Sequence, residues 1–116
     1  MSKLKNEYTC SLILANDLVG GKWKLRILWH IIQGDNHFSL LKKTIPDITE
    51  KMLTTQLKEL VDNKLIKRNI LSDKPLSVEY SLSKDYGELK DIVESLCKFS
   101  SDYGEENNIK IEDEWV

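Results

Sequence analysis

The sequence predicts an α+β fold that is mostly helical. Five segments space their apolar residues as helices do, and strand-like alternation is confined to two short segments, 65–71 and 78–82. The polar sequence Ser72-Asp73-Lys74-Pro75 separates these two segments and predicts a β-hairpin. Two short helices precede the hairpin, which is the order of a winged helix-turn-helix. Two helices before this unit and one after it complete the predicted fold, and we expect the first and the last helix to serve in dimerisation.

The size and composition indicate one globular domain. The chain has 116 residues, with 41% hydrophobic and 31% charged residues, which suffices to bury a single core. We therefore expect one domain over residues 1–116, with an acidic tail at about 102–116. No apolar run approaches the roughly 18 residues that span a bilayer, and no secretory signal begins the chain. A cytoplasmic protein without a membrane partner is expected.

The two cysteines exclude a disulfide scaffold. Cys10 and Cys97 are far apart in sequence, and there is no CxxC motif or Cys/His cluster. We expect neither a metal nor another cofactor. An enzyme is also not expected, because the histidines lie near neither cysteine and no pair of carboxylates has a diagnostic spacing.

The charge is divided unevenly along the chain. The net charge is −2, but residues 1–84 hold 14 Lys and Arg against 9 Asp and Glu, whereas residues 85–116 hold 3 against 10. The basic excess coincides with the predicted helix-turn-helix, and the local potential matters more to DNA than the total charge. The acidic tail is expected to face away from any DNA.

The first two helices are predicted before the helix-turn-helix. One begins near Thr9 and ends at Gly20-Gly21, where glycine accepts a positive φ angle. The other spans Lys22 to Gln33 and is apolar around nearly its whole circumference, so it should be the buried central helix. His30 lies within it and is expected to be a packed side chain rather than a ligand.

The helix-turn-helix is predicted at residues 39–64. A short helix from Ser39 to Thr44, preceded by a short strand at 36–38, leads into a turn that holds Pro46 and Asp47. Thr49 is a favourable N-cap for the second helix. That helix has an apolar stripe (Leu53, Leu57, Leu60, Val61) and an opposite face with Lys51, Met52, Thr55 and Lys58, on which Glu59 is the one acid. An ordinary amphipathic helix in a small domain is the alternative interpretation.

The last predicted helix, about 84–101, has a broad apolar stripe. Its members, with one residue beyond it, are Leu89, Ile92, Val93, Leu96, Phe99 and Tyr103. The stripe exceeds what one small domain needs at its C-terminus, so a partner helix is expected to cover it. The acidic residues from Asp102 onward are expected to be flexible despite Ile109, Ile111 and Trp115.

As a set, these residues resemble the HxlR-type family of bacterial winged-helix transcription regulators over roughly Cys10 to Phe99. The matching residues are Cys10, Gly20-Gly21-Lys22-Trp23, Phe38, Leu41, Ile45-Pro46, Ile48-Thr49, Met52-Leu53, Leu57, Leu60, Leu65-Ile66, Arg68, Pro75, Val78-Glu79-Tyr80, Leu82-Ser83 and Gly87. Three positions depart from the family pattern. Lys64 replaces a glycine after the recognition helix, so Asn63 or Lys64 is expected to adopt a left-handed conformation. Ser11 replaces a proline, and Phe99 stands where the aromatic residue is often tryptophan.

The resemblance implies a homodimer, formed by the first and last helices, that binds a palindromic operator in double-stranded DNA. The expected interface residues are Leu12, Leu89, Ile92, Val93, Leu96 and Phe99. The expected DNA contacts are Thr49, Lys51, Thr55 and Lys58 on the recognition helix, Thr54 and Gln56 on its flanks, and Lys67, Arg68 and Lys74 on the wing.

The predicted function is therefore that of a homodimeric, sequence-specific DNA-binding transcription regulator. Two alternatives stay open: a winged-helix module for protein–protein assembly, and a regulator switched by a small non-redox ligand, whose identity the sequence does not indicate. Cys10 is a candidate redox sensor, because the helix dipole at a helix N-terminus favours a thiolate and Lys3 and Lys5 are nearby. In several members of the family a cysteine at this position senses oxidants or electrophiles. The alternative is that Cys10 is a small buried hydrophobe, and Cys97 is expected in the core.

Overall fold

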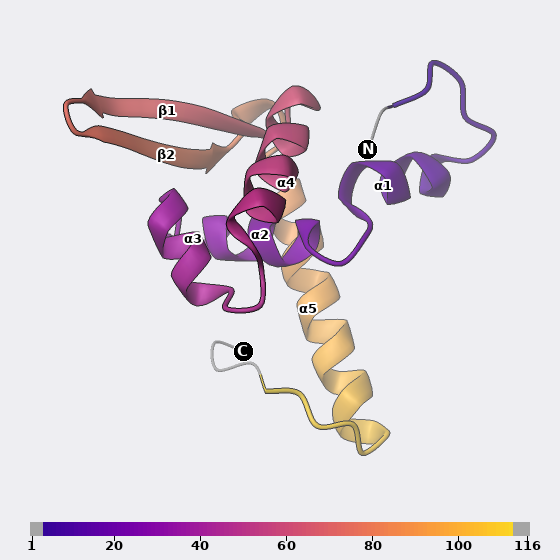
Figure 1. Cartoon of the computed structure of the whole chain (residues 1–116). Coiled ribbons are helices and arrows are strands. Elements are labelled where there is room, and N and C mark those ends of the chain that lie inside the picture. The colour runs from indigo at the N-terminus through magenta and orange to yellow at the C-terminus, as the bar shows by residue number, and fades with distance from the viewer. Residues whose placement is uncertain (1–3, 113–116) are drawn as a thin grey trace.

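The computed structural model describes residues 4–112 and confirms the winged helix-turn-helix (Figure 1). The elements follow in the order α1 (Ser11–Val19), α2 (Lys24–Ile32), α3 (Phe38–Thr44), α4 (Glu50–Asp62), β1 (Ile66–Asp73), β2 (Leu76–Leu82), a 3₁₀ turn (Lys84–Tyr86) and α5 (Leu89–Glu106). In the view of Figure 1 the hairpin projects on one side of α4, α1 lies on the other, and α5 extends away from the body. Lys3 and Trp115 lie outside the described residues.

Helix α2 is the centre of the core, as predicted. It contacts α3, α4, α5 and β2. Ile27 and Leu28 are fully buried, and the other elements supply Leu41, Ile45, Ile48, Leu53, Leu57, Leu60, Leu65, Ile66, Tyr80 and Val93. Each large apolar side chain buried in this way stabilises the fold by roughly 1.5–3 kcal/mol. The helix-turn-helix is thus fixed to a single core through its apolar stripes.

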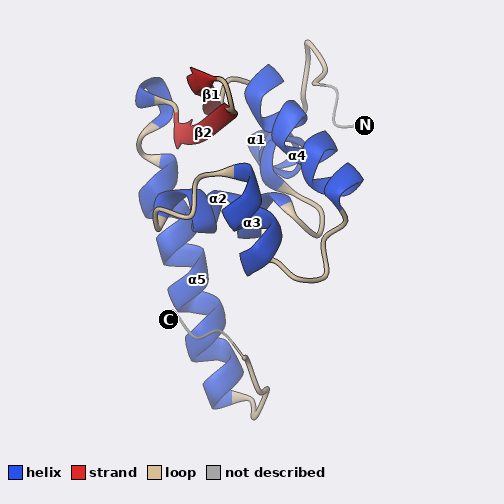
Figure 2. Cartoon of the chain, turned by 60° about the vertical axis from the view of Figure 1, so that its left-hand side comes forward, coloured by secondary structure: helices blue, strands red, loops and turns tan. Residues whose placement is uncertain are grey.

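The wing is a two-stranded antiparallel sheet (Figure 2). Its register pairs Ile66 with Leu82 and Arg68 with Tyr80, with an irregularity between Ile70 and Ser72. The base of the hairpin is tied to the body, because the Tyr80 amide donates to the Asn36 carbonyl over 2.8 Å. The strand predicted at 36–38 is wrong: only an isolated bridge at His37 forms, since Phe38 already begins α3.

Two of the three residues predicted as helix N-caps do not precede the observed helices. Cys10, not Thr9, precedes α1, and His37, not Ser39, precedes α3. Helix α2 begins at Lys24 because the chain bends through residues 21–23. The cap of α4 is confirmed: the Thr49 hydroxyl accepts from the Met52 amide over 3.1 Å. Lys64 takes the left-handed conformation after α4, with φ of 65°.

The C-terminal region is more ordered than predicted. Residues 102–106, expected in a flexible tail, form the end of α5. The chain then folds back, and the Ile109 amide donates to the Gly104 carbonyl over 2.8 Å. Gly104 is buried, and a Cβ there would lie 2.7 Å from Ile111 Cδ1 and 3.3 Å from the Ile109 carbonyl oxygen, so a larger residue would require the Ile111 side chain and the returning chain to shift. Among the described helices, none is long and apolar enough to cross a membrane.

Candidate nucleic-acid interface

Helix α4 presents a polar face to solvent because its other face is anchored. Leu53, Leu57 and Leu60 are at most 1% exposed. On the opposite side Lys51, Thr54, Thr55 and Lys58 are all exposed, as is the capping residue Thr49. A helix fixed by three buried leucines holds its exposed side chains in a defined direction, which a recognition helix requires.

The two threonines of this face are arranged as hydrogen-bond acceptors. The Thr54 hydroxyl donates to the Glu50 carbonyl over 2.9 Å, and the Thr55 hydroxyl donates to the Lys51 carbonyl over 3.0 Å. Their hydrogens are thus engaged within the helix, while the hydroxyl oxygens can still accept and the methyl groups can make apolar contacts. Base amino groups and the thymine methyl group are the complementary features of a major groove.

The lysines of α4 differ in their surroundings. Lys51 makes no ion pair with any described residue, whereas Lys58 Nζ lies 2.8 Å from Asp62 Oδ2. The hydrogen bond with Asp62 raises the pKa of Lys58 above its ordinary value. Both side chains of this pair are well exposed, so the pair is weak and Lys58 can exchange its partner for a phosphate.

Gln56 and Glu59 are turned towards α2 rather than outwards. Lys24 Nζ donates to Gln56 Oε1 over 2.8 Å and to Glu59 Oε1 over 2.7 Å. Glu59 is therefore not on the outer face, where the helical spacing had placed it. Lys24 is 4% exposed and was missed by the sequence reasoning. The available signal was that a cation within a helix predicted to be buried requires a partner. The ion pair between Lys24 and Glu59 holds α4 against α2.

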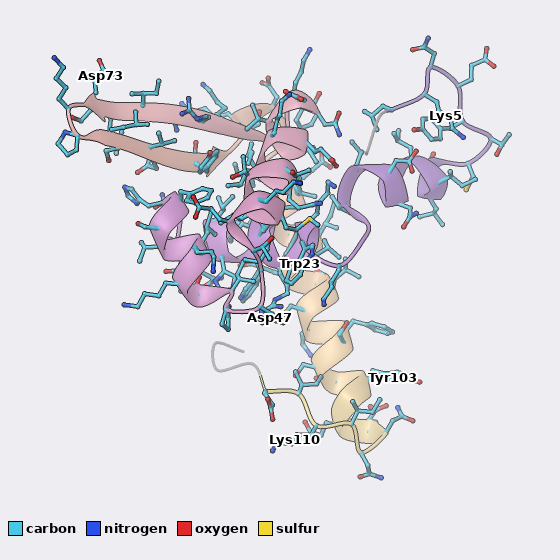
Figure 3. The ribbon with its side chains drawn as sticks, viewed as in Figure 1. Lys5, Trp23, Asp47, Asp73, Tyr103 and Lys110 are labelled. Carbon is cyan, nitrogen blue, oxygen red and sulfur yellow. The ribbon has the colours of Figure 1, made fainter. Side chains whose placement is uncertain are left out.

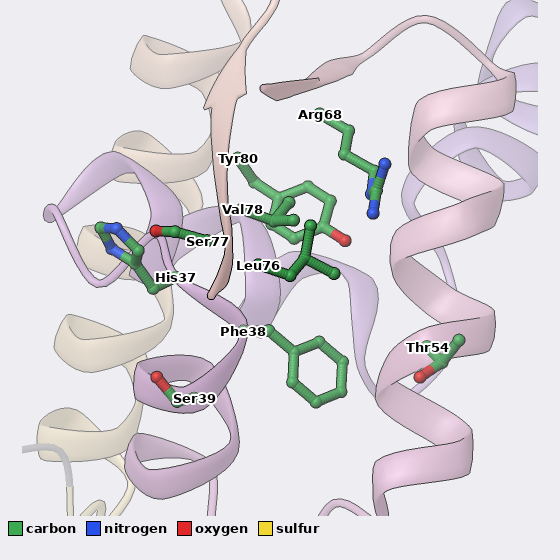
Figure 4. A pocket seen from close by; sticks show the side chains of 9 residues that line it. All are labelled: His37, Phe38, Ser39, Thr54, Arg68, Leu76, Ser77, Val78 and Tyr80. Carbon is green, nitrogen blue, oxygen red and sulfur yellow. The ribbon is translucent and has the colours of Figure 1, made fainter. Parts of the chain in front are cut away.

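The wing cations do not share one surface. Lys67 and Arg68 are neighbours on β1, so their side chains leave opposite faces of the sheet. Arg68 is paired with Tyr80 and lies on the face towards α4 (Figure 4). Lys74 is exposed and follows Asp73, which Figure 3 labels at the tip of the hairpin. The wing thus offers separate cations to the flanks of α4 rather than one basic patch.

A second basic group lies at the start of α2. Lys22 Nζ is 4.7 Å from the centre of the Trp23 ring, and the Arg26 guanidinium is 5.8 Å from it. Arg26 also pairs with Asp47 over 3.7 Å, which ties α2 to the turn of the helix-turn-helix. No described group of three or more His, Cys, Asp or Glu residues could hold a metal ion.

Cys10 is exposed, so its interpretation as a buried hydrophobe is wrong for the single chain. Its carbonyl accepts from the Ile13 amide over 3.1 Å at the start of α1, but its side chain does not cap the helix. The preceding arm folds against α1, because the Tyr8 hydroxyl donates to Asp17 over 2.6 Å. This hydrogen bond raises the pKa of Tyr8. Cys97 is half-buried beside α2 rather than in the core.

The predicted interface residues fall into two groups. Leu12 is 77% exposed, Ile92 48%, Leu96 42% and Phe99 67%. Ile13 and Tyr103 are exposed as well, at 47% and 53%. In contrast, Val93 is buried in the chain's own core and Leu89 packs against that core. An apolar surface on α1 and α5 is therefore uncovered in the single chain.

Comparisons with known proteins show the family of the chain. The family described as HxlR-like helix-turn-helix matches residues 18–108. The chain is 43% identical over 99 residues to the uncharacterised HTH-type transcriptional regulator YdzF of Bacillus subtilis, covering 84% of this chain and 85% of that protein. It is 38% identical over 99 residues to the regulator YtcD of the same organism, covering 85% and 79%.

Solved structures have the same fold. The crystal structure of YtcD gives a TM-score of 0.74 at 36% identity, covering 82% of this chain and 97% of that one. The redox regulator HypR gives 0.72 at 34% identity in its oxidised form, covering 84% and 96%. In its reduced form HypR gives 0.73 at 33% identity, covering 85% and 94%.

Proposed function

The chain belongs to the HxlR-like helix-turn-helix family of transcriptional regulators, and from this premise we propose that it is a homodimer that binds a palindromic operator in double-stranded DNA. Each subunit inserts α4 into a major groove and places its hairpin on the flanking backbone. The proposed activity is DNA binding, and no catalytic reaction is proposed.

The observation that carries this proposal is the exposed polar face of α4. Lys51 and Lys58 supply charge for phosphates, which gives affinity and salt dependence. Thr54 and Thr55 supply acceptors and methyl groups for base edges, which gives sequence preference. Arg68 and Lys74 extend the contacts on the wing, and Lys67 leaves the opposite face of the hairpin.

The test is the double variant Lys51→Ala/Lys58→Ala. Binding to the DNA upstream of the chain's own gene is measured by fluorescence anisotropy at several salt concentrations. The loss of two phosphate contacts should weaken binding and flatten the slope of log affinity against log salt by about 2. Circular dichroism and light scattering check the fold and the assembly.

Helix α5 offers a matched control. Lys98 pairs with Asp102 over 2.7 Å, as Lys58 pairs with Asp62, and Lys90 is exposed as Lys51 is. Lys90→Ala/Lys98→Ala should leave the DNA affinity unchanged. If the two double variants bind DNA with equal affinity, Lys51 and Lys58 do not contact DNA, and the proposal that α4 forms the DNA-binding surface is wrong. Failure of the wild-type chain to bind DNA at low salt would favour the protein–protein module.

The dimer is supported by the exposed apolar residues on α1 and α5. Light scattering at micromolar concentration should give about twice the 13.5 kDa mass of the chain. Phe99→Glu should shift the mass towards the monomer, because a carboxylate would be buried against the partner. Leu71→Glu is the control, since Leu71 is a similarly exposed apolar residue on the wing. A wild-type monomer would contradict binding to two half-sites.

We further propose that modification of Cys10 weakens DNA binding. The supporting observation is its exposure at the start of α1, about one turn before the exposed Ile13. The similarity to HypR, a redox regulator, is consistent with this role. A quinone would add to the Cys10 thiolate to form a thioether, and this bulk would disturb α1 and the spacing of the two recognition helices.

The experiment is a DNA titration with and without a quinone, using wild type, Cys10→Ser and Cys97→Ser. Wild type and Cys97→Ser should lose affinity, and Cys10→Ser should keep it. If Cys10→Ser loses affinity as wild type does, Cys10 is not the switch, and the remaining candidate is a small non-redox ligand.

A further inference from the structure

We propose that the groove between the hairpin, α3 and α4 binds a small aromatic carboxylate and that the bound ligand weakens DNA binding, the second part of which rests on the proposed function. The groove has a volume of about 500 Å³. Pockets for small molecules span roughly 300–1,000 Å³. Figure 4 shows the side chains of β1, β2, α3 and α4 that line it.

One part of the groove is apolar. Phe38 is the first residue of α3 and turns its ring towards the groove, while Leu76 and Val78 line it from β2 (Figure 4). Leu76 is 64% exposed, although a leucine would be more stable under cover. An aromatic ring between Phe38 and these two residues would remove apolar surface from water on both sides.

The other part of the groove provides hydrogen-bond donors without partners. Arg68 and the Tyr80 hydroxyl point into the same gap between hairpin and α4 (Figure 4). Neither group has a side-chain hydrogen bond or ion pair within residues 4–112. The described residues that line the groove include no Asp or Glu, so the positive charge of Arg68 is unopposed there. The planar guanidinium matches a carboxylate with two parallel hydrogen bonds.

The threonine at the edge of the groove sets the orientation of the ligand. The Thr54 hydroxyl hydrogen is already donated to Glu50, so Thr54 gives the ligand no donor in this arrangement. The carboxylate therefore lies against Arg68 and Tyr80, and the ring lies towards Phe38 and Val78. A bare phosphate would use the charge of Arg68 but leave the apolar part of the groove in water. The two-part lining favours an anion with an aromatic body.

A ligand in this position would act on both DNA-contacting elements. It would neutralise Arg68 and occupy the space between hairpin and α4, where the hairpin must approach the backbone. Lower DNA affinity of the liganded protein follows, and by linkage the operator lowers the ligand affinity by the same factor.

Binding is measured first without DNA, by titrating benzoate into isotopically labelled protein and following amide and side-chain shifts in NMR spectra. Saturating shifts should gather at Phe38, Val78 and Tyr80. Arg68→Gln should weaken binding at least about tenfold, the factor for one lost charge-assisted hydrogen bond. Lys67→Gln is the matched control with the same charge change on the opposite face of the strand, and it should bind as wild type does. Leu76→Ser should weaken benzoate without altering the fold, because Leu76 is largely exposed.

Two further probes separate the parts of the site. Benzamide, which lacks the charge, and inorganic phosphate, which lacks the ring, should each bind more weakly than benzoate. Absence of benzoate shifts at the groove, equal loss in Arg68→Gln and Lys67→Gln, or phosphate binding as well as benzoate would each overturn the proposal. The affinity of the protein for operator DNA is then measured with and without benzoate. DNA binding by the wild type without benzoate tests the proposed function alone, so its failure is distinguishable from failure of the groove.

Discussion

Replacing Lys24 by methionine should destabilise the protein strongly. Methionine keeps most of the length of the side chain but removes the ammonium group that donates to Gln56 and Glu59 over 2.8 and 2.7 Å. Lys24 is 4% exposed, and the Glu59 side chain is 14% exposed. The substitution therefore leaves a carboxylate with little access to water and no cation beside it.

The size of the effect follows from this burial. Breaking a buried ion pair by removing one partner costs about 3–5 kcal/mol. Glu59 retains some contact with water, so the lower end, about 3 kcal/mol, is expected. The free energy of unfolding of a domain of this size is about 5–15 kcal/mol. A loss of about 3 kcal/mol should lower the midpoint of thermal unfolding by roughly 10 °C or more.

Urea unfolding followed by circular dichroism at one fixed protein concentration measures the loss, since the stability of a dimer depends on concentration. Lys58→Met is the control: it also breaks a lysine–carboxylate pair on α4, but an exposed one, and should cost far less. The double variant Lys24→Met/Glu59→Met removes both charges and should regain most of the stability. Equal losses for Lys24→Met and Lys58→Met, or no recovery in the double variant, would refute the role of the pair in holding α4.

Three further outcomes are expected. Thr49→Ala should lower the free energy of unfolding by about 1 kcal/mol through loss of the N-cap, whereas Thr49→Ser should keep it; equal stabilities would contradict the cap. Gly104→Ala should loosen the chain that folds back over α5, because its Cβ would lie 2.7 Å from Ile111 Cδ1 and 3.3 Å from the Ile109 carbonyl oxygen, so both must shift; faster amide exchange at residues 107–112 with an intact core is the readout, and unchanged exchange counts against it. The pKa of Tyr8 should lie above the ordinary 10.0 because its hydroxyl donates to Asp17, so the stabilisation is complete below pH 10 and is lost as the pH rises through the raised pKa. Ultraviolet titration should show the Tyr8 pKa falling in Asp17→Ala, and no fall would remove Asp17 as the cause.

Local patterns in the chain were enough to predict the helix-turn-helix. The stripe Leu53, Leu57 and Leu60 has the period of a helix, and the same residues are buried in the structure. Thr49 was predicted as a cap because a hydroxyl can accept an amide hydrogen two or three residues ahead, which needs no information from other elements. The family pattern has a glycine where this chain has Lys64, so a left-handed backbone conformation was predicted at Asn63 or Lys64. The residue that adopts it is Lys64.

Other positions depended on which elements pack together. Helical spacing placed Glu59 outside and gave Lys24 no partner, but the crossing of α2 over α4 brings the two side chains to 2.7 Å. The stripe of α5 was read as one face, although α2 covers Val93 and leaves Ile92 and Phe99 exposed. The groove at Arg68 has lining residues from four elements between positions 37 and 80.

The sequence by itself determined the order of the elements, the capped second helix of the helix-turn-helix and the identity of its exposed cations and hydroxyls, because these depend on the period and on contacts within a few residues. The tertiary structure decided the partner of Lys24, the return of the chain over Gly104 and the groove beside Arg68. Each of these needs atoms that are distant in sequence to approach within a few ångströms, and the approach is set by the packing of whole helices and strands against one core.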